Sequence, residues 1–223
     1  MMVRTYGVDC NQVAMAIASA AKYNMVIFAG LTSLDNLVPN LNSMISQVGS
    51  NWHMINTVSI GNELVNDGLA AVGEVVAALG TTRSVLKPAG FGGPIVTVDV
   101  FDQIVAHPEL CGASDYCAAN CHAFFDDEIT ADKAGDYVSK IWSWIAQQIP
   151  GKEVMITESG WPWGGSANGA AIPSVANQQV AIASLRSAFA NNSGSIFLFD
   201  SYDAEWKQSG PLGVEQYFGI YGH

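Results

Sequence analysis

The sequence predicts an α/β fold, a parallel sheet closed into a (β/α)8 (TIM) barrel that lacks its first β/α unit at the N-terminus. Short apolar segments alternate with amphipathic helical segments, which is typical of a parallel sheet covered by helices. Polar and aromatic residues gather where the predicted strands end, and no dinucleotide-binding glycine pattern follows the first strand, which favours a barrel over an open sheet. The chain has 223 residues, whereas a complete barrel takes about 250, or roughly 31 per unit. Since the chain begins inside a strand-like segment, we expect a single, N-terminally truncated barrel domain over residues 1–223.

Hydrophobic periodicity places each element along the chain. The predicted strands cover residues 3–6, 25–29, 55–60, 85–86, 116–121, 154–157 and 196–199, with 85–86 the poorest of the seven. The predicted helices cover residues 12–21, 37–48, 69–79, 130–148 and a segment that begins after the N-cap Ser174. The glycine cluster at 89–94 lacks the Lys-Ser/Thr pair of a phosphate-binding loop, so we expect a turn there.

Composition and charge exclude several classes of protein. The chain is 49% hydrophobic and 13% charged, and its formal net charge is -11. This charge would repel nucleic acid and anionic lipid surfaces, so neither is an expected partner. The sequence holds no apolar segment long enough to span a membrane and does not begin with a secretory signal pattern. We expect a monomer that is either mature or truncated.

The four cysteines, Cys10, Cys111, Cys117 and Cys121, have none of the spacings of zinc or CxxC redox sites. Two disulfides would suit a secreted protein, and free buried thiols are the equal alternative for any single cysteine. The sequon at Asn191 also favours secretion.

Two glutamates stand where predicted strands end, Glu63 and Glu158. They lie about 95 residues apart, close to three barrel units of roughly 31 residues, so they would face each other across the mouth of a barrel. Two carboxyl groups about 5 Å apart are what glycoside hydrolysis with retention of configuration requires. The alternative is that two of the twenty acidic residues lie at strand ends by chance.

The neighbouring residues favour the first interpretation. Asn62 precedes Glu63 and supplies an amide suited to a sugar hydroxyl. Aromatic residues follow the strand ends, and their flat faces suit pyranose rings; they are Phe124, Phe125, Trp161, Trp163, Tyr202 and Trp206.

Two segments carry a resemblance to a known family. Residues 58–63 (VSIGNE) and 156–162 (ITESGWP) resemble the two active-site motifs of glycoside hydrolase family 17, within it the fungal cell-wall β-1,3-glucanases and glucanosyltransferases. Further fungal-branch segments are similar to residues 3–7, 119–125, 199–203 and 206–207. The resemblance implies a (β/α)8 barrel that needs no metal or organic cofactor.

The resemblance also implies a role for individual residues. Glu63 would be the acid/base and Glu158 the nucleophile, with Asn62 at the hydroxyl beside the anomeric carbon and Tyr6 near the nucleophile. The residues that would line sugar subsites are Asn120, Phe124, Trp161, Asp200, Tyr202 and Trp206. His122 would be either a hydrogen-bonded structural residue or a ligand contact, and no metal is assigned to it.

The leading hypothesis is therefore a secreted or cell-wall enzyme that acts on β-1,3-glucan with retention, either as an endo-1,3-β-glucosidase or as a β-1,3-glucanosyltransferase in fungal cell-wall remodelling. The alternative hypotheses are a catalytically silent β-glucan-binding wall protein or fragment, and a related barrel enzyme acting on another β-glycan. The sequence leaves hydrolysis and transfer open, because the choice depends on whether water or a second glucan chain accepts the glycosyl group.

Overall fold

Short apolar segments form the strands of the computed structural model, which describes residues 1–221. In chain order the strands are β1 (Met2–Thr5), β2 (Val26–Leu31), β3 (Ile55–Asn62), β4 (Ile95–Val100), β5 (Cys117–Asn120), β6 (Val154–Ser159) and β7 (Ile196–Leu198). The strand order of the sheet is that of the sequence, and the registered pairs are parallel. Sequential parallel neighbours require a crossover after each strand, which the helices supply.

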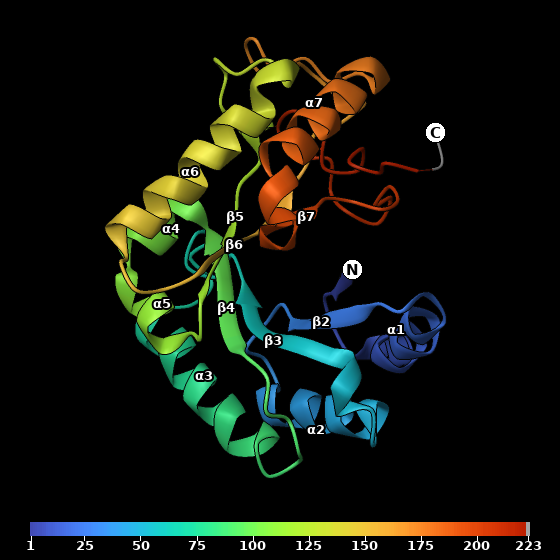
Figure 1. The fold of residues 1–223 in the computed structure, drawn as a ribbon, viewed down its shortest axis with the longest axis vertical. Coiled ribbons are helices and arrows are strands. Elements are labelled where there is room, and N and C mark those ends of the chain that lie inside the picture. The colour runs from blue at the N-terminus through green and yellow to red at the C-terminus, as the bar shows by residue number, and fades with distance from the viewer. Residues whose placement is uncertain (222–223) are drawn as a thin grey trace. The chain divides into compact units, whose positions relative to one another are not determined.

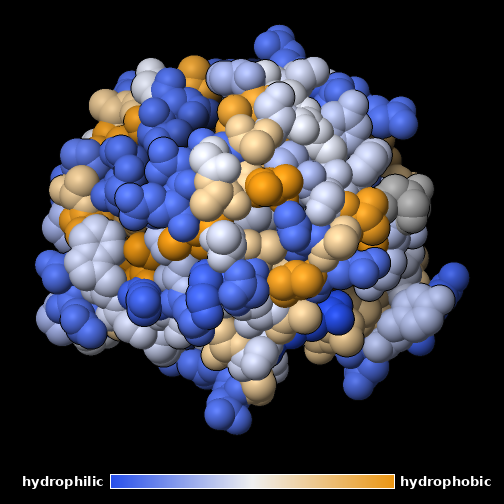
Figure 2. Space-filling model, turned by 90° about the horizontal axis from the view of Figure 1, so that it is seen from above, coloured by the Kyte–Doolittle hydropathy of each residue, from blue (hydrophilic) through white to orange (hydrophobic). Residues whose placement is uncertain are grey.

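Amphipathic segments form the helices between the strands. They are α1 (Gln12–Ala20), α2 (Leu37–Val48), α3 (Val72–Leu86), α4 (Phe101–Ala106), α5 (Pro108–Ala113), α6 (Ala134–Gln148) and α7 (Val175–Ala188). Between residues 1 and 221, none of these helices has the combination of length and apolar character that spanning a bilayer requires. Hydrophilic side chains cover much of the face seen in Figure 2, with hydrophobic ones scattered between them.

The chain folds into two compact units. Unit 1 consists of Met1–Ala118 together with Ile149–Glu153, and unit 2 consists of Ala119–Gln148 and the residues from Val154 on. The single barrel domain over residues 1–223 stays a prediction.

Unit 1 packs helices α1 and α3 against its strands, and α2 packs against α1 and α3 (Figure 1). The buried face of α2 carries Leu41, Met44 and Val48, which are spaced three and four residues apart as an amphipathic helix requires. These side chains join a hydrophobic cluster that includes Ile27 of β2 and Val58 of β3. The cluster holds the strands that carry the candidate site of this unit.

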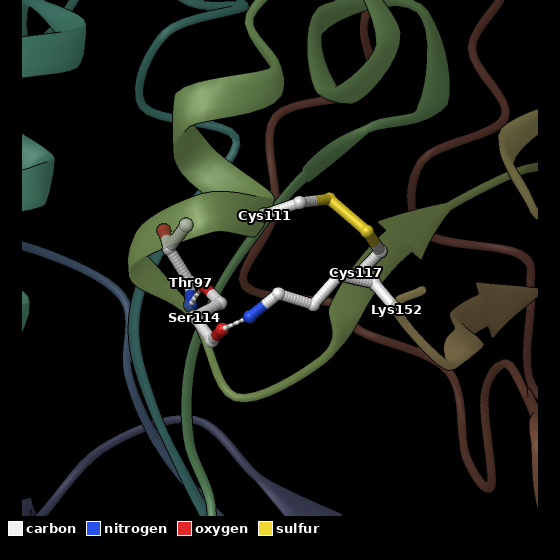
Figure 3. The surroundings of a disulfide bond; sticks show 5 residues. All are labelled: Thr97, Cys111, Ser114, Cys117 and Lys152. Atoms are coloured by element: carbon white, nitrogen blue, oxygen red, sulfur yellow. Dashed lines mark hydrogen bonds between the residues drawn. A yellow bond between two sulfur atoms is a disulfide. The ribbon is translucent and has the colours of Figure 1, made fainter. Parts of the chain in front are cut away.

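A disulfide joins Cys111 at the end of α5 to Cys117 at the start of β5 (Figure 3). Ser114 lies between the two cysteines, and its hydroxyl accepts a hydrogen bond of 3.0 Å from the backbone N–H of Thr97. Lys152 Nζ donates a 2.6 Å hydrogen bond to the Ser114 carbonyl oxygen. The two remaining thiols are free, Cys10 exposed and Cys121 buried. The described residues thus hold one disulfide in place of the two considered, and of the free thiols only Cys121 is buried as the alternative expected.

Unit 2 packs α6 closely against α7. A Cβ atom on Gly135 would collide with the Ser184 carbonyl oxygen, so only glycine allows this approach of the two helices. The hydroxyl of Ser184 accepts a 3.0 Å hydrogen bond from the backbone N–H of Gly135. Ser174 caps α7 as predicted, since its Oγ accepts a 3.0 Å hydrogen bond from the backbone N–H of Asn177.

One predicted strand is wrong and another was missed. Residues 85–86 form the last turn of α3, because Leu79, Thr82 and Leu86 continue the buried stripe of the helix. The fourth strand is instead β4, which follows Pro94 and consists of β-branched residues except for Asp99. The predicted number of strands, seven, agrees with the structure only because these two differences cancel.

Candidate active site

Glu63 lies in a tight turn directly after β3. Its φ of 57° and the φ of 82° at Gly61 place both residues in the left-handed region, where glycine is favoured and other residues are uncommon. The backbone N–H of Glu63 donates a 3.0 Å hydrogen bond to the carbonyl oxygen of Val98 on β4. The turn therefore holds the half-buried Glu63 at the carboxyl end of β3.

A buried carboxylate fixes the residues that follow Glu63. Asp99 of β4 is 2% exposed, and its oxygens accept hydrogen bonds from the backbone N–H groups of Val65 at 2.9 Å and Asn66 at 3.3 Å. A third bond of 2.9 Å comes from the N–H of Val100. Burial raises the pKa of Asp99 above its ordinary value, while these three backbone bonds act in the opposite direction.

Arg4 orients the amide of Asn62. Arg4 Nη2 donates a 2.7 Å hydrogen bond to Asn62 Oδ1, and its guanidinium lies 4.5 Å from the centre of the Tyr6 ring. Because the amide oxygen faces Arg4, the NH2 group of Asn62 faces away from it as a donor. Arg4 and the two predicted residues Tyr6 and Asn62 thus form one cluster near the ends of β1 and β3.

Two adjoining cavities lie beside this cluster in unit 1. The larger, of about 520 Å³, is lined by polar residues including Asn62, Asp35 and Glu74. The smaller, of about 200 Å³, is lined by residues including Tyr6 and Asn40. Thr32 and Ser33, directly after β2, line both. Among the described residues, the charged side chains that line the cavities are carboxylates, Asp9 in the smaller and Asp35 and Glu74 in the larger, so neither lining favours an anionic ligand.

The lining residues after β2 were not among the predicted site residues. Thr32 and Ser33 are common loop residues, and only their position at the carboxyl end of a strand could have indicated a role.

Glu158 belongs to unit 2 and is the last residue but one of β6. It is 6% exposed, and its Oε2 lies 3.5 Å from Nε2 of His122, which follows β5. Its backbone carbonyl accepts a 2.9 Å hydrogen bond from the N–H of Cys121. Carboxylates and imidazoles are both side chains that can act as acids, bases or nucleophiles in catalysis.

Two further predicted residues stand at strand ends of unit 2. Asn120 is the last residue of β5 and is 1% exposed, and its Oδ1 accepts a 2.8 Å hydrogen bond from the Thr157 hydroxyl. Asp200 follows β7. Burial raises the pKa of Asp200, and the negative charge of Glu158 raises it further. Glu158, Asn120 and Asp200 therefore occupy the carboxyl ends of three successive strands.

The predicted aromatic residues fall into two groups. Phe124 and Trp161 are fully buried, with ring centres 5.3 Å apart in an edge-to-face arrangement. Trp161 Nε1 donates a 3.1 Å hydrogen bond to the Ile172 carbonyl oxygen. Tyr202 and Trp206, by contrast, are 67% and 84% exposed. Phe125, which is 49% exposed, joins the second group, and Trp163 is half-buried.

Across residues 1–221, His, Cys, Asp and Glu side chains form no group of three or more that could hold a metal ion.

Comparison with known proteins identifies the family of this chain. A family model described as the BtgE/BtgC glycoside hydrolase domain matches residues 1–219. The chain belongs to this glycoside hydrolase family. Among curated members, the chain is 41% identical to the cell surface mannoprotein MP65 of Candida albicans over its whole length. It is 40% identical over 98% of its length to the probable family 17 glucosidase SCW10 of Saccharomyces cerevisiae. These matches confirm the predicted resemblance to family 17 in its fungal branch.

The chain spans little more than half the length of these curated relatives, 58% of the Candida protein and 56% of the Saccharomyces protein. Longer members also include the probable β-glucosidase btgE of Aspergillus fumigatus, which is 30% identical over 98% of the chain and of which the chain covers 39%.

Solved structures confirm the predicted fold class. The family 17 β-1,3-glucanosyltransferase of Rhizomucor miehei has the same fold, with a TM-score of 0.83 at 22% identity, over 98% of this chain and 80% of that one. An active-site mutant of the same enzyme in complex with laminaritriose gives a TM-score of 0.81 at 21% identity with the same coverage. This family 17 chain thus has the strand and helix arrangement of a (β/α) barrel, with seven strands in its described residues.

Proposed function

We propose that this domain is a retaining glycoside hydrolase that acts on β-1,3-glucan, with Glu158 as nucleophile and Glu63 as acid/base. The observation that carries the proposal is that a glutamate stands at the carboxyl end of a strand in each unit of a family 17 chain. The Rhizomucor relative, named as a β-1,3-glucanosyltransferase and solved with laminaritriose, supports a β-1,3-glucan as substrate.

The reaction has two steps. In the first, one carboxylate oxygen of Glu158 bonds to the anomeric carbon, the glycosidic C–O bond breaks, and Glu63 gives its proton to the departing oxygen. In the second, Glu63 takes a proton from the acceptor while the acceptor oxygen displaces Glu158 from the sugar. Water as acceptor gives an endo-1,3-β-glucosidase, and a second glucan chain gives a glucanosyltransferase.

The remaining predicted residues have binding roles in this proposal. Tyr6, Asn62, Asn120 and Asp200 would contact sugar, while Tyr202 and Trp206 would stack on sugar rings with their exposed faces.

Phe124 and Trp161 are placed differently, because both are fully buried. They would support the sugar-contacting residues from behind.

We further propose that the protein acts as a monomer in the fungal cell wall, where a β-1,3-glucan substrate would be remodelled. The relative in Candida albicans is named as a cell surface mannoprotein, which supports this location. The Cys111–Cys117 disulfide supports an oxidising compartment.

Product analysis with laminari-oligosaccharides of defined length tests the proposal. Glu158→Gln and Glu63→Gln should each lose turnover with unchanged thermal unfolding. Glu109→Gln, which alters an exposed glutamate of α5, should be as active as the wild type. Shorter products alone would identify hydrolysis, and longer ones transfer. Turnover retained by Glu158→Gln would refute the proposal, and so would glucan binding without any product, which fits a silent wall-binding protein.

The two glutamates can also be told apart. With an aryl β-glucoside whose leaving group needs no proton, Glu63→Ala should still form the glycosyl-enzyme, and added azide should restore turnover because azide attacks without a general base. Azide should not restore the turnover of Glu158→Ala to a product that retains the β configuration. Proton NMR of the first product should show the β-anomer, and an α-anomer would contradict retention.

A further inference from the structure

His122 occupies an aromatic cage beside Glu158. Its ring centre lies 6.0 Å from that of Phe125, 5.3 Å from that of Phe199 and 5.3 Å from that of Phe218. The three contacts are edge-to-face, with interplanar angles of 74°, 81° and 73°. The His122 side chain is 11% exposed. Packing on three phenyl rings fixes the plane of the imidazole, so the direction of each ring nitrogen is fixed as well.

The two ring nitrogens of His122 have different surroundings. Nε2 lies 3.5 Å from Oε2 of Glu158, whereas Nδ1 is buried and has no hydrogen-bond partner among the described residues. A neutral imidazole carries its proton on one nitrogen only. A proton on Nδ1 would leave a buried donor unpaired. It would also point the lone pair of Nε2 at the Glu158 carboxylate, which is itself an acceptor. The surroundings therefore favour the neutral tautomer with its proton on Nε2.

We propose that His122 is a positioning residue whose Nε2–H group holds Oε2 of the Glu158 carboxylate. This inference rests on the proposed role of Glu158 as nucleophile. The distance of 3.5 Å is longer than a strong hydrogen bond, and such contacts often shorten when substrate binds. The donor fixes the rotation of the carboxylate and stabilises its charged form, which is the form that attacks.

The contact can stay in place during the first step. One carboxylate oxygen of Glu158 forms the new bond to the anomeric carbon. The glycosidic bond breaks, its oxygen takes the proton of Glu63, and His122 keeps its own proton throughout. In the glycosyl-enzyme, Nε2–H still donates to the carboxyl group of Glu158, which is now an ester.

Three substitutions separate this role from packing. His122→Phe keeps an aromatic ring in the cage and removes the donor. His122→Gln places an amide NH2 near the position of Nε2, and His122→Asn places it near that of Nδ1. We expect His122→Phe and His122→Asn to lose kcat by a factor on the order of 100, with little change in KM, because the nucleophile is misplaced. His122→Gln should recover most of the lost kcat.

All variants should be compared with Glu158→Gln for turnover and with the wild type for Tm. A wild-type kcat in His122→Phe would overturn the inference. An equal loss of kcat in His122→Gln and His122→Phe, at equal Tm, would overturn it as well. In either case an inactive Glu158→Gln would leave the proposed function intact. Activity in Glu158→Gln would instead overturn the proposed function.

A second measurement does not need turnover. Long-range ¹H–¹⁵N NMR spectra of the wild-type protein report the tautomer of His122 directly. The Nε2–H form is expected, and an Nδ1–H form would overturn the inference in an active or an inactive protein alike.

Discussion

Asp99 Oδ2 accepts a 2.9 Å hydrogen bond from the backbone N–H of Val65, two residues beyond Glu63. The buried carboxylate thus holds the turn that carries the proposed acid/base. An amide at this position has only one oxygen, and its NH2 group would face backbone donors. Asp99→Asn should therefore lower the free energy of unfolding by about 1–3 kcal/mol. It should also lower kcat, because the Glu63 turn loses its anchor.

Asp102→Asn is the matched control for this prediction, since Asp102 is an exposed residue of the neighbouring helix α4. Urea unfolding and laminari-oligosaccharide turnover measure the two effects. If Asp99→Asn behaved like Asp102→Asn in both, the turn would not depend on the carboxylate.

Trp206 should contribute to glucan binding through its exposed ring face. It is 84% exposed, so its removal should not disturb the core. Trp206→Ala should weaken laminarin binding by about tenfold, equivalent to about 1.4 kcal/mol, with an unchanged Tm. Tyr23, which is 76% exposed in unit 1, provides the control Tyr23→Ala. Isothermal titration calorimetry decides the matter, and equal affinities of the two variants would exclude a specific role for Trp206.

The raised pKa of Asp200 predicts the sign of a pH effect on stability. Because burial raises this pKa above 3.8 in the folded protein, the folded state holds the proton to higher pH than the unfolded chain does. The stability that Asp200 contributes is complete below pH 3.8 and is lost as the pH rises through the raised pKa. The wild type should therefore lose stability relative to Asp200→Asn as the pH rises through this window.

Asp132 provides a control of opposite sign. A hydrogen bond from the Thr130 hydroxyl lowers the pKa of the exposed Asp132. The stability that Asp132 contributes is present above pH 3.8 and is lost as the pH falls through the lowered pKa. Urea unfolding of wild type, Asp200→Asn and Asp132→Asn across the acidic range should show the two opposite trends. A difference between wild type and Asp200→Asn that does not vary with pH would contradict the assignment.

The Cys111–Cys117 disulfide closes a short loop, with a sequence separation of six residues. Loop-closure entropy for so short a loop corresponds to about 2 kcal/mol of stability. Cys111→Ala combined with Cys117→Ala should lower the free energy of unfolding by about this amount, as measured by urea unfolding. Cys10→Ser changes an exposed free thiol and should leave the stability unchanged. Loss of stability in Cys10→Ser alone would indicate that the cysteines pair differently.

Local patterns in the sequence were sufficient for most of the fold. Residues 37–48 form α2 with the predicted bounds. The helical spacing of its buried side chains can be seen within the segment itself, so no knowledge of distant contacts is needed. Residues 85–86 could not be assigned in this way, since a two-residue apolar pair fits the end of a helix as well as a strand. The deciding contact is the burial of Leu86 against the rest of unit 1.

The candidate site depends more on contacts between distant residues. Glu63 and Glu158 could be predicted from their motifs, as could the amide of Asn62. The cage of Phe125, Phe199 and Phe218 around His122 could not, because its members come from separate parts of the chain. The burial of Trp161 depends on the same kind of packing, so an aromatic residue after a strand end does not by itself predict an exposed ring.

Residues 149–153 connect α6 to β6 but belong to unit 1. Within this stretch, Lys152 donates a hydrogen bond to the Ser114 carbonyl. The chain consequently passes from one unit to the other after residues 118, 148 and 153. No single cut in the polypeptide yields both units whole. A recombinant half that ends at Ala118 would carry the Glu63 turn without the lysine that holds Ser114. Genetic dissection of this domain into an acid/base half and a nucleophile half would therefore require grafting residues 149–153 onto the first piece.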